Sequence, residues 1–366
     1  MTAKIKYVAT TLATLLFLGG FSLWAMLRPA DEFSDTERRP LKQFPELSVQ
    51  TLLEGSFMEF FEGYTLDQFP MRESFRTIKA LVADKVFLRG DNNGIFEEDG
   101  YLSKLDYPLN EESVTHAAER FKYVYDRFLA GKDVNTYLAV IPDKNYFLAE
   151  ENGYPSIDYD ALYEAIYEKT PFLTPIELRG QVKLSDFYKT DTHLRQESLL
   201  PTASALLTGM GGKADAKYEK VTLSTPFYGV YHGQSALDPA PDVLSYLTSD
   251  ALKECKVFDY QNNKEISVYE LSKAEGKDPY EVFLGGPLSL VTIENSNADT
   301  DKELVVFRDS FGSAIVPLLA EDYAKITLVD IRYLHPLLLG SSIQFESQDV
   351  LFLYSTSVLN NSETIK

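Results

Sequence analysis

The stretch Leu304-Val305-Val306-Phe307-Arg308-Asp309-Ser310-Phe311-Gly312 is the part of this sequence that says most about its fold. Four apolar residues run into a polar turn, and a helix-like stretch follows from residue 314 to residue 323. A serine at the carboxyl end of a strand, on the turn into a helix, occupies the place where parallel α/β proteins keep their reactive groups. The N–H groups at the start of the helix could bind an oxyanion. Ser310 is therefore a candidate nucleophile, although Asp309-Ser310 is also the pattern of a helix N-cap.

A second segment, Thr190-Asp191-Thr192-His193, contains the groups that such a serine needs. A histidine can take the serine proton, and a carboxylate can orient that histidine. His193 has a carboxylate two residues away in a polar loop; the other three histidines are His116, His232 and His335. Asp191, His193 and Ser310 together predict a split Ser-His-Asp triad. The alternative is an ordinary loop histidine and a serine that caps a helix.

Strand-like and helix-like segments alternate from residue 92 onward. Strands are predicted at 101–102, 134–141, 182–184, 304–307, 325–330 and 350–354, and helices at 111–130, 161–169, 196–207 and 314–323. This alternation is typical of α/β proteins with a doubly wound parallel sheet. Lys144, Asp191 and Ser310 would then lie near the carboxyl edge of one sheet, where a crevice forms.

Residues 214–300 are less regular and are interpreted as an irregular insertion into a catalytic domain that spans 56–366. Within the insertion, the stretch from Phe227 to Gly233 is rich in aromatic residues and glycine. It suits either a loop that approaches the site or a β-hairpin with a buried aromatic face.

The amino-terminal segment indicates export. Lys4 and Lys6 precede an apolar stretch from Tyr7 to Leu27, which is about the length needed to cross a bilayer core of ~30 Å. We expect residues 1–30 to be an uncleaved signal-anchor, with the bulk of the chain outside. The alternative is a cleaved signal peptide and a secreted protein.

Beyond the anchor, residues 31–55 have the composition of a linker, and residues 56–88 show helical periodicity divided by Phe69-Pro70. Because acidic residues crowd the first half of 56–88, we expect these two helices to cover the catalytic domain rather than to contact lipid.

Composition excludes several classes of function. A formal charge of −20 argues against a nucleic-acid partner, since phosphates need a basic surface. The single cysteine, Cys255, excludes an internal disulfide and a cysteine-based metal site. No nucleotide-binding glycine motif or cluster with metal-ligand spacing is present in the sequence, so no metal or cofactor is expected.

Most of the chain after residue 30 resembles the DHHW family, which is related to the alginate O-acetylation proteins and is SGNH-hydrolase-like. The resemblance rests on Glu37-Arg38-Arg39-Pro40-Leu41 with Phe44-Pro45, Asp67-Gln68-Phe69-Pro70-Met71-Arg72, Asn93-Gly94-Ile95, Asp99-Gly100-Tyr101-Leu102, Ile141-Pro142-Asp143-Lys144, Thr190–His193, Arg308–Gly312 and Asp330-Ile331-Arg332-Tyr333. It implies an SGNH-like sheet and the triad of Asp191, His193 and Ser310. Thr192 and Leu194 depart from the family motif, which usually has His and Trp there.

The resemblance also implies a function. We expect an extracytoplasmic O-acetyltransferase that moves an acetyl group through a serine acyl-enzyme to a polysaccharide hydroxyl. The acyl donor would be a polytopic membrane acyltransferase. Further oxyanion or substrate candidates are Lys144, Asn145, Arg308, Arg332 and Tyr333. A polysaccharide acetyl-esterase and a non-catalytic envelope protein for binding or assembly remain as alternatives.

Overall fold

The chain divides into two compact units in the computed structural model, which describes residues 3–213, 215–237 and 239–366. The first unit comprises Met1–Asn93 with His232–Asp238, and the second comprises Gly94–Tyr231 with Pro239–Lys366. The sequence placed the start of the catalytic domain at residue 56, whereas residues 56–93 have their contacts with the amino-terminal unit. The domain boundaries of 1–30, 31–55 and 56–366 remain a prediction.

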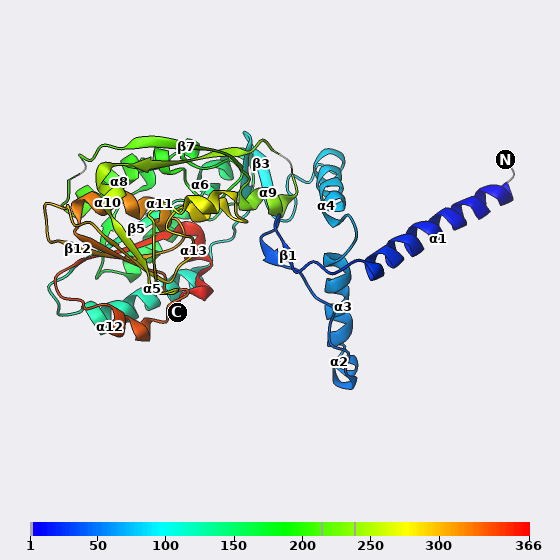
Figure 1. Ribbon diagram of the computed structural model, residues 1–366, viewed down its shortest axis with the longest axis horizontal. Coiled ribbons are helices and arrows are strands. Elements are labelled where there is room, and N and C mark those ends of the chain that lie inside the picture. Colours follow the sequence, from blue (N-terminus) through cyan, green and yellow to red (C-terminus); the bar gives the residue numbers. More distant parts are fainter. Residues whose placement is uncertain (1–2, 214, 238) are drawn as a thin grey trace. The chain divides into compact units, whose positions relative to one another are not determined.

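A mixed sheet of eight strands forms the centre of the second unit (Figure 1). Its order is β10-β9-β11-β13-β12-β14-β5-β6. The strands are β5 (Asn135–Ile141), β6 (Thr174–Ile176), β9 (Lys256–Asp259), β10 (Lys264–Ile266), β11 (Leu290–Glu294), β12 (Glu303–Arg308), β13 (Lys325–Val329) and β14 (Asp349–Ser355). Pairs from β13 through β12, β14 and β5 to β6 are parallel, and the pairs that involve β11, β9 and β10 are antiparallel. The predicted α/β class with a parallel sheet is confirmed.

Helices cover both faces of this sheet, as a doubly wound fold requires. Alternate residues of a strand face opposite sides, so Val306 and Val305 belong to different buried clusters. One cluster takes side chains from α8 (Leu200–Gly209) and α11 (Gly312–Ile315). The other takes them from α5 (Glu111–Val124), α7 (Tyr159–Lys169) and α13 (Thr356–Asn360). Burial on both faces explains why β12 and β14 are almost continuously apolar.

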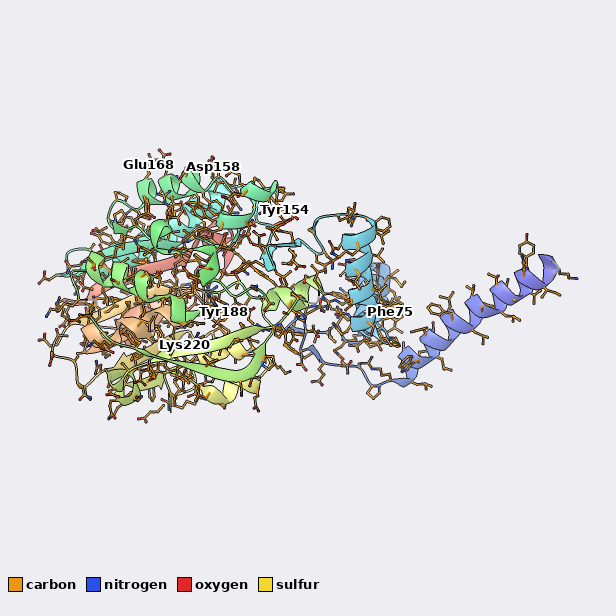
Figure 2. The ribbon with its side chains drawn as sticks, turned by 90° about the horizontal axis from the view of Figure 1, so that it is seen from above. Phe75, Tyr154, Asp158, Glu168, Tyr188 and Lys220 are labelled. Carbon is orange, nitrogen blue, oxygen red and sulfur yellow. The ribbon has the colours of Figure 1, made fainter. Side chains whose placement is uncertain are left out.

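Smaller elements complete the second unit. Two hairpins are formed by β3 (Ile95–Glu98) with β4 (Tyr101–Lys104), and by β7 (Glu219–Phe227) with β8 (Asp242–Thr248). The remaining short helices of this unit are α6 (Asn145–Leu148), α10 (Asp250–Glu254) and α12 (Leu339–Ser342), while α9 (Val230–Ser235) begins in it and ends among the residues of the first unit. With its side chains drawn, Figure 2 places Tyr188 within this unit, where it is buried, and Asp158 and Glu168 on its surface.

The first unit is mostly helical. It contains α1 (Ala3–Leu27), β1 (Phe33–Ser34), β2 (Arg39–Pro40), α2 (Val49–Leu53), α3 (Ser56–Asp67), α4 (Arg72–Leu81) and the π-helical turn η1 (Val82–Val86). The predicted break at Phe69-Pro70 is confirmed, since it separates α3 from α4. Arg39 joins β2 to the end of α3 by donating to both carboxylate oxygens of Asp67, at 2.9 and 2.6 Å. Within α1, the 24 residues Lys4–Leu27 are long and apolar enough for a membrane anchor or a signal sequence.

Three local predictions from the sequence are wrong. Residues 182–184 are not a strand; they follow the 3-10 turn η4 (Arg179–Gln181) and run into η5 (Leu184–Asp186). The stretch 314–323 is not one α-helix, because α11 continues as the 3-10 segment η9 (Val316–Asp322), where Pro317 has no N–H to donate. Finally, residues 214–300 are not only an insertion, since β9, β10 and β11 extend the central sheet.

Candidate active site

Ser310 lies on the turn that joins β12 to α11, at the carboxyl edge of the parallel strands. The carboxylate of Asp309, which is fully buried, fixes this turn. It accepts hydrogen bonds from the Phe311 N–H at 3.0 Å, the Ser355 N–H at 2.8 Å and the Ser355 hydroxyl at 2.7 Å. Asp309 thus ties the serine turn to the end of β14, the neighbouring strand, and leaves the hydroxyl of half-buried Ser310 free to face the histidine loop.

The three predicted triad residues form one continuous chain of hydrogen bonds. His193 Nδ1 lies 2.6 Å from Asp191 Oδ1, and His193 Nε2 lies 2.8 Å from Ser310 Oγ. Asp191 is fully buried, and the His193 side chain is 12% exposed. With Asp191 ionised, Nδ1 carries the proton and Nε2 is left to accept one from the serine. The geometry is that of a nucleophile, a base and an orienting carboxylate.

The segment after β7 holds the second oxygen of Asp191. The Val230 N–H donates to Asp191 Oδ2 at 2.8 Å, and the Gly229 N–H donates to Thr190 Oγ1 at 2.8 Å. A Cβ atom at Gly229 would lie 2.3 Å from Asp191 Cβ, so only glycine permits this approach. Both interpretations of the stretch from Phe227 to Gly233 hold in part: β7 is a hairpin strand that ends at Phe227, and the residues after it reach the site.

A half-buried carboxylate that the sequence did not single out positions the loop itself. Asp242, at the start of β8, accepts from the Lys189 N–H at 2.8 Å and the Thr190 N–H at 2.7 Å. It also accepts from the Thr190 hydroxyl at 2.6 Å. An acidic residue that starts a strand 51 positions after Asp191 carries no sequence signal of this role.

Lys144 supports the loop from the opposite side and is 2% exposed. Its Nζ donates to the carbonyl oxygens of Asp191 at 2.6 Å, Leu102 at 2.7 Å and Lys189 at 3.3 Å. Burial lowers the pKa of the Lys144 ammonium to about 7, and the carboxylates of Asp191 and Asp242 partly oppose that shift. The structure therefore gives this substrate candidate three backbone carbonyl partners, one of which belongs to the triad candidate Asp191.

An aromatic residue that the sequence analysis missed stacks on the imidazole of His193. The rings of Tyr280 and His193 are nearly parallel, at 8°, with centroids 3.8 Å apart. Phe311 lies beside His193 at 5.2 Å between centroids. Tyr280 is buried, and its hydroxyl has no hydrogen-bond partner among the described residues. The ring, rather than the hydroxyl, is thus what Tyr280 brings to His193.

Of the other substrate candidates, two arginines are bonded to protein groups and one tyrosine is exposed to solvent. Arg308 is fully buried and donates to the carbonyl oxygens of Leu288 at 3.2 Å and Asp309 at 3.3 Å, while burial lowers its pKa. Arg332 donates to both oxygens of Asp330, at 2.9 and 2.7 Å. Tyr333 is 53% exposed. The two arginines therefore have protein partners, and only Tyr333 among these presents a largely free side chain.

Asn145, the residue after Lys144, differs from the arginines. It is 2% exposed, and its Oδ1 accepts from the Ser103 hydroxyl at 3.3 Å. Its Nδ2 is buried without any hydrogen-bond partner in the described part of the chain. An unpaired buried N–H donor is costly, by about 1–3 kcal/mol, and such groups are frequent where a ligand supplies the missing acceptor.

Histidines outside the triad have other contacts. His116 Nδ1 lies 3.0 Å from the Ser362 hydroxyl, and His335 Nδ1 accepts from the Leu337 N–H at 3.2 Å. Cys255 is a free thiol whose pKa burial raises to about 11. Among residues 3–213, 215–237 and 239–366, no group of three or more His, Cys, Asp or Glu residues could hold a metal ion.

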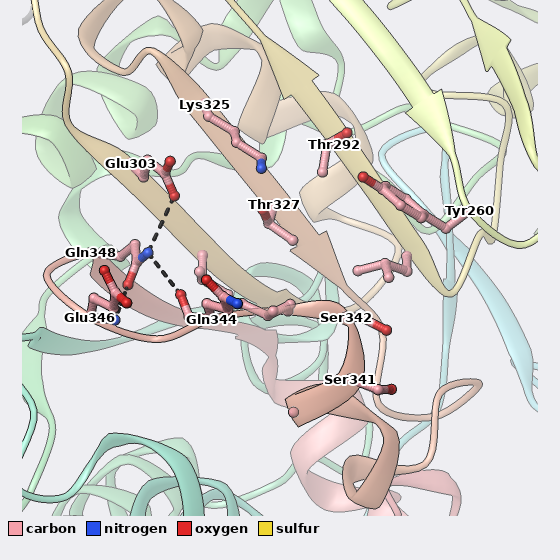
Figure 3. A pocket seen from close by; sticks show the side chains of 14 residues that line it. Tyr260, Thr292, Glu303, Lys325, Thr327, Ser341, Ser342, Gln344, Glu346 and Gln348 are labelled. Atoms are coloured by element: carbon pink, nitrogen blue, oxygen red, sulfur yellow. Dashed lines mark hydrogen bonds between the residues drawn. The ribbon is translucent and has the colours of Figure 1, made fainter.

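A separate polar pocket of about 420 Å³ lies at the amino ends of the parallel strands, opposite to the carboxyl ends that Ser310 follows (Figure 3). It is lined by side chains from the beginnings of β12 and β13, such as Glu303 and Lys325, and by the segment around α12. Because Ser310 follows the carboxyl end of β12, this pocket is distinct from the triad.

Solved structures share this fold. A DHHW family protein from Eubacterium siraeum superposes with a TM-score of 0.61 at 22% identity, over 75% of this chain and 95% of its own. Bacillus cereus PatB1, solved with a sulfonyl adduct, gives 0.57 at 21% identity, over 72% of this chain and 95% of its own. The O-acetyltransferase domain of Pseudomonas putida AlgJ gives only 0.45 at 15% identity, over 73% of this chain and 92% of its own. No family model and no curated protein sequence matches the chain.

The mixed α/β fold with a mostly parallel central sheet is therefore shared with the DHHW family protein and with PatB1. The resemblance to the DHHW family, drawn from short motifs, is matched at the level of the fold by a DHHW family protein.

Proposed function

We propose that this protein is a membrane-anchored, extracytoplasmic O-acetyltransferase that uses Ser310 as its nucleophile. The observation that carries the proposal is the unbroken hydrogen-bond chain from Asp191 through His193 to Ser310. The DHHW resemblance supports acetyl as the group transferred. The apolar helix α1 supports attachment to a membrane.

The first half-reaction moves the acyl group onto the serine. Ser310 Oγ attacks the carbonyl carbon of the donor ester while its proton passes to His193 Nε2. Asp191 stabilises the imidazolium that forms and keeps Nδ1 protonated. When the tetrahedral intermediate collapses, the imidazolium returns the proton to the leaving alcohol, and the acyl-enzyme ester remains.

We propose that two N–H groups bind the oxyanion of that intermediate. In the part of the chain that the structure describes, the Ser310 N–H has no hydrogen-bond partner. The buried Nδ2 of Asn145 also lacks one. We assign both to the oxyanion, since preorganised donors of this kind each stabilise the transition state by about 3 kcal/mol.

In the second half-reaction, a polysaccharide hydroxyl gives its proton to His193 and attacks the acyl-enzyme. The acetyl ester of the glycan forms as the bond to Ser310 Oγ breaks, and the imidazolium of His193 returns the proton to Ser310 Oγ. Export creates a need for an acyl donor outside the cytoplasm, and we propose a polytopic membrane acyltransferase in that role by analogy with the family. An acetyl-esterase would use the same residues with water as the acceptor.

The departures from the family motif do not remove any triad group, which weighs against a non-catalytic role. The Thr192 hydroxyl accepts from the Tyr231 hydroxyl at 3.0 Å, and Leu194 is buried opposite Phe187. Both positions are filled by side chains that pack within the protein.

Mass spectrometry of the intact protein tests this proposal. We would incubate wild type, Ser310→Ala and Ser341→Ala separately with an activated acetyl ester and with a sulfonyl fluoride. Ser341→Ala is the control, because it changes an exposed serine outside the candidate triad. We expect one adduct per chain in wild type and Ser341→Ala, and none in Ser310→Ala. Equal labelling of Ser310→Ala would overturn the assignment.

Adding an oligosaccharide acceptor to the acetylated enzyme then separates the two activities. Transfer predicts that the adduct disappears faster with acceptor than with water alone, and that the oligosaccharide gains the acetyl group. Loss at the same rate with free acetate as the only product indicates an esterase.

A further inference from the structure

We propose that one face of α4 and η1 lies on the lipid surface beside α1, so that the first unit is a membrane-interface module as well as an anchor. This inference concerns the first unit alone and does not depend on the chemistry of Ser310.

An exposed apolar stripe runs along this helical segment. Met71 lies directly before α4, and Phe75, Ile78, Val82 and Val86 follow at intervals of three or four residues, which places these four on one helix face. The five residues are 52%, 38%, 54%, 37% and 67% exposed, respectively. Leu81, Phe87 and Leu88 are also exposed and extend the apolar surface. Water-soluble proteins rarely leave contiguous apolar surface of this extent uncovered.

The opposite face of the helix is already occupied by protein. Arg72 and Arg76 both pair with Glu37, at 2.5 and 3.3 Å, and Arg76 donates to the Gly233 carbonyl at 2.7 Å. Ala80 is fully buried on the same side. These contacts fix the rotation of α4 within its unit and turn the stripe outward.

The stripe begins where α1 meets the unit. Phe21 of α1 stacks on Phe69, with ring centroids 5.3 Å apart and planes 1° apart, and makes an edge contact with Phe75 at 5.9 Å. Phe21 is six residues before the end of α1 at Leu27, or about 9 Å along the helix axis. Amphipathic helices in the plane of a membrane bury their apolar face about 5–10 Å deep. If α1 spans the bilayer, Phe75 therefore starts at the depth that an interfacial helix needs.

The charge of the segment also suits a lipid surface. Residues 71–89 contain five basic and two acidic residues in a chain of net charge −20. Arg72 and Arg76 pair with Glu37 on the covered face, so the basic residues left for a lipid surface are Lys79, Lys85 and Arg89. Basic residues beside an apolar stripe are typical of helices that lie on anionic membranes. From the sequence we expected this region to cover the catalytic domain because of its acidic residues. Those residues are concentrated in α3, as Glu59, Glu62 and Asp67, and the exposed stripe of α4 favours lipid instead.

Site-directed fluorescence on the full chain in lipid nanodiscs tests the proposal. Each variant carries one cysteine, introduced into a Cys255→Ser background and labelled with the fluorophore NBD. Ile78→Cys and Val86→Cys place the label on the stripe, and Thr77→Cys is the matched control. Thr77 neighbours Ile78 but lies about 100° away around the helix. The nanodiscs contain phosphatidylethanolamine and phosphatidylglycerol, with or without doxyl-labelled lipid, and iodide is the quencher in water. Because α1 is retained in every variant, the signal reports the position of α4 alone.

We expect emission from positions 78 and 86 to be shifted to the blue and quenched at least twofold more by doxyl lipid than emission from position 77. Iodide should quench position 77 more strongly. Equal quenching of positions 77 and 78 by iodide would overturn the proposal. Shielding of positions 78 and 86 from both quenchers would overturn it too, because the stripe would then be covered by protein.

Discussion

At the scale of single residues, the site depends on side chains that hold His193 as much as on those that react. Asp191 fixes one ring nitrogen, and Tyr280 fixes the plane of the ring from its face. Lys144 and Asp242 hold the backbone of the loop that carries both triad members, from carbonyl and N–H groups respectively. We therefore predict separate effects for changes at Tyr280, which contacts the His193 ring, and at Lys144, which contacts the loop.

Replacing Tyr280 by Leu should lower kcat for hydrolysis of p-nitrophenyl acetate about tenfold, with little change in KM. The imidazole loses the ring that restricts it, and a small misplacement of a catalytic group costs rate. Tyr280→Phe is the control and should retain most of the wild-type kcat, since the tyrosine hydroxyl makes no hydrogen bond among the described residues. A Phe variant as slow as the Leu variant would show that the hydroxyl, not the ring, matters.

Lys144 predicts a dependence of stability on pH. Its pKa falls from 10.5 to about 7 on folding, because burial disfavours the charge. Between pH 7 and pH 10 the unfolded chain therefore binds more protons than the folded one, and this group makes the free energy of unfolding rise with pH. We expect the rise from pH 7 to pH 9 to be smaller in Lys144→Met than in wild type by about 1 kcal/mol per pH unit, measured by urea denaturation. Parallel pH profiles for the two proteins would contradict a lowered Lys144 pKa.

At the scale of elements, the site is assembled where segments far apart in the sequence end together. The end of β12 brings Ser310, the loop after η5 brings Asp191 and His193, and the residues between β7 and α9 close on Asp191 from the side. The end of β14 contributes Ser355, which binds Asp309 under the serine turn. At Asp191 and at Asp309 a backbone N–H, of Val230 and of Ser355 respectively, donates to the carboxylate, so both contacts depend on close approach of the chain.

Gly229→Ala tests the closest of these approaches. The new Cβ would lie 2.3 Å from Asp191 Cβ and 2.4 Å from the Thr190 carbonyl oxygen, and the segment would have to move away. The Val230 N–H to Asp191 bond would then break, and we expect kcat/KM to fall at least tenfold and Tm to fall by several degrees. Gly180→Ala is the matched control, since a Cβ at Gly180 meets nothing within 4 Å, and both measurements should stay near wild type. A fully active Gly229→Ala enzyme would mean that this contact is dispensable.

At the scale of the whole molecule, the unit that holds the candidate triad is joined to a small helical unit with exposed apolar surface. The second unit buries its apolar side chains on both faces of its sheet. The first unit leaves α1 uncovered by protein along its apolar window. This division of surface predicts how the full chain behaves in cells.

The full chain should resist extraction from membranes by alkaline carbonate, and its intact mass should include α1. A chain that lacks residues 1–27 should be extracted by carbonate, because the apolar helix is what prevents solubilisation. Western blots of the two fractions, with intact mass of the membrane fraction, make the measurement. A mature amino terminus near residue 31 would instead show that α1 is a cleaved signal sequence.

Much of this arrangement was predictable from local pattern. The apolar run of β12, the strand β14 and the helix α5 are read directly from the sequence because burial on both sheet faces demands continuous apolar strands and amphipathic helices cover them. Asp191, His193 and Ser310 could be proposed as partners because their chemistry is specific, although they remain a candidate triad until labelled. The strand predicted at 182–184 failed because three alternating residues do not distinguish a strand from 3-10 turns without knowledge of their pairing.

What the sequence by itself determined is the class of fold, the apolar amino-terminal helix and the three residues that can act as nucleophile, base and orienting acid. What only the tertiary structure decided is the support around them: Tyr280 on the imidazole, Asp242 and Lys144 on the loop, Gly229 against Asp191, and the outward turn of the α4 stripe. The physical reason is that backbone amides, carbonyl groups and a tyrosine ring occur everywhere in a chain. Only the distance and direction that the folded chain gives them determine what they hold.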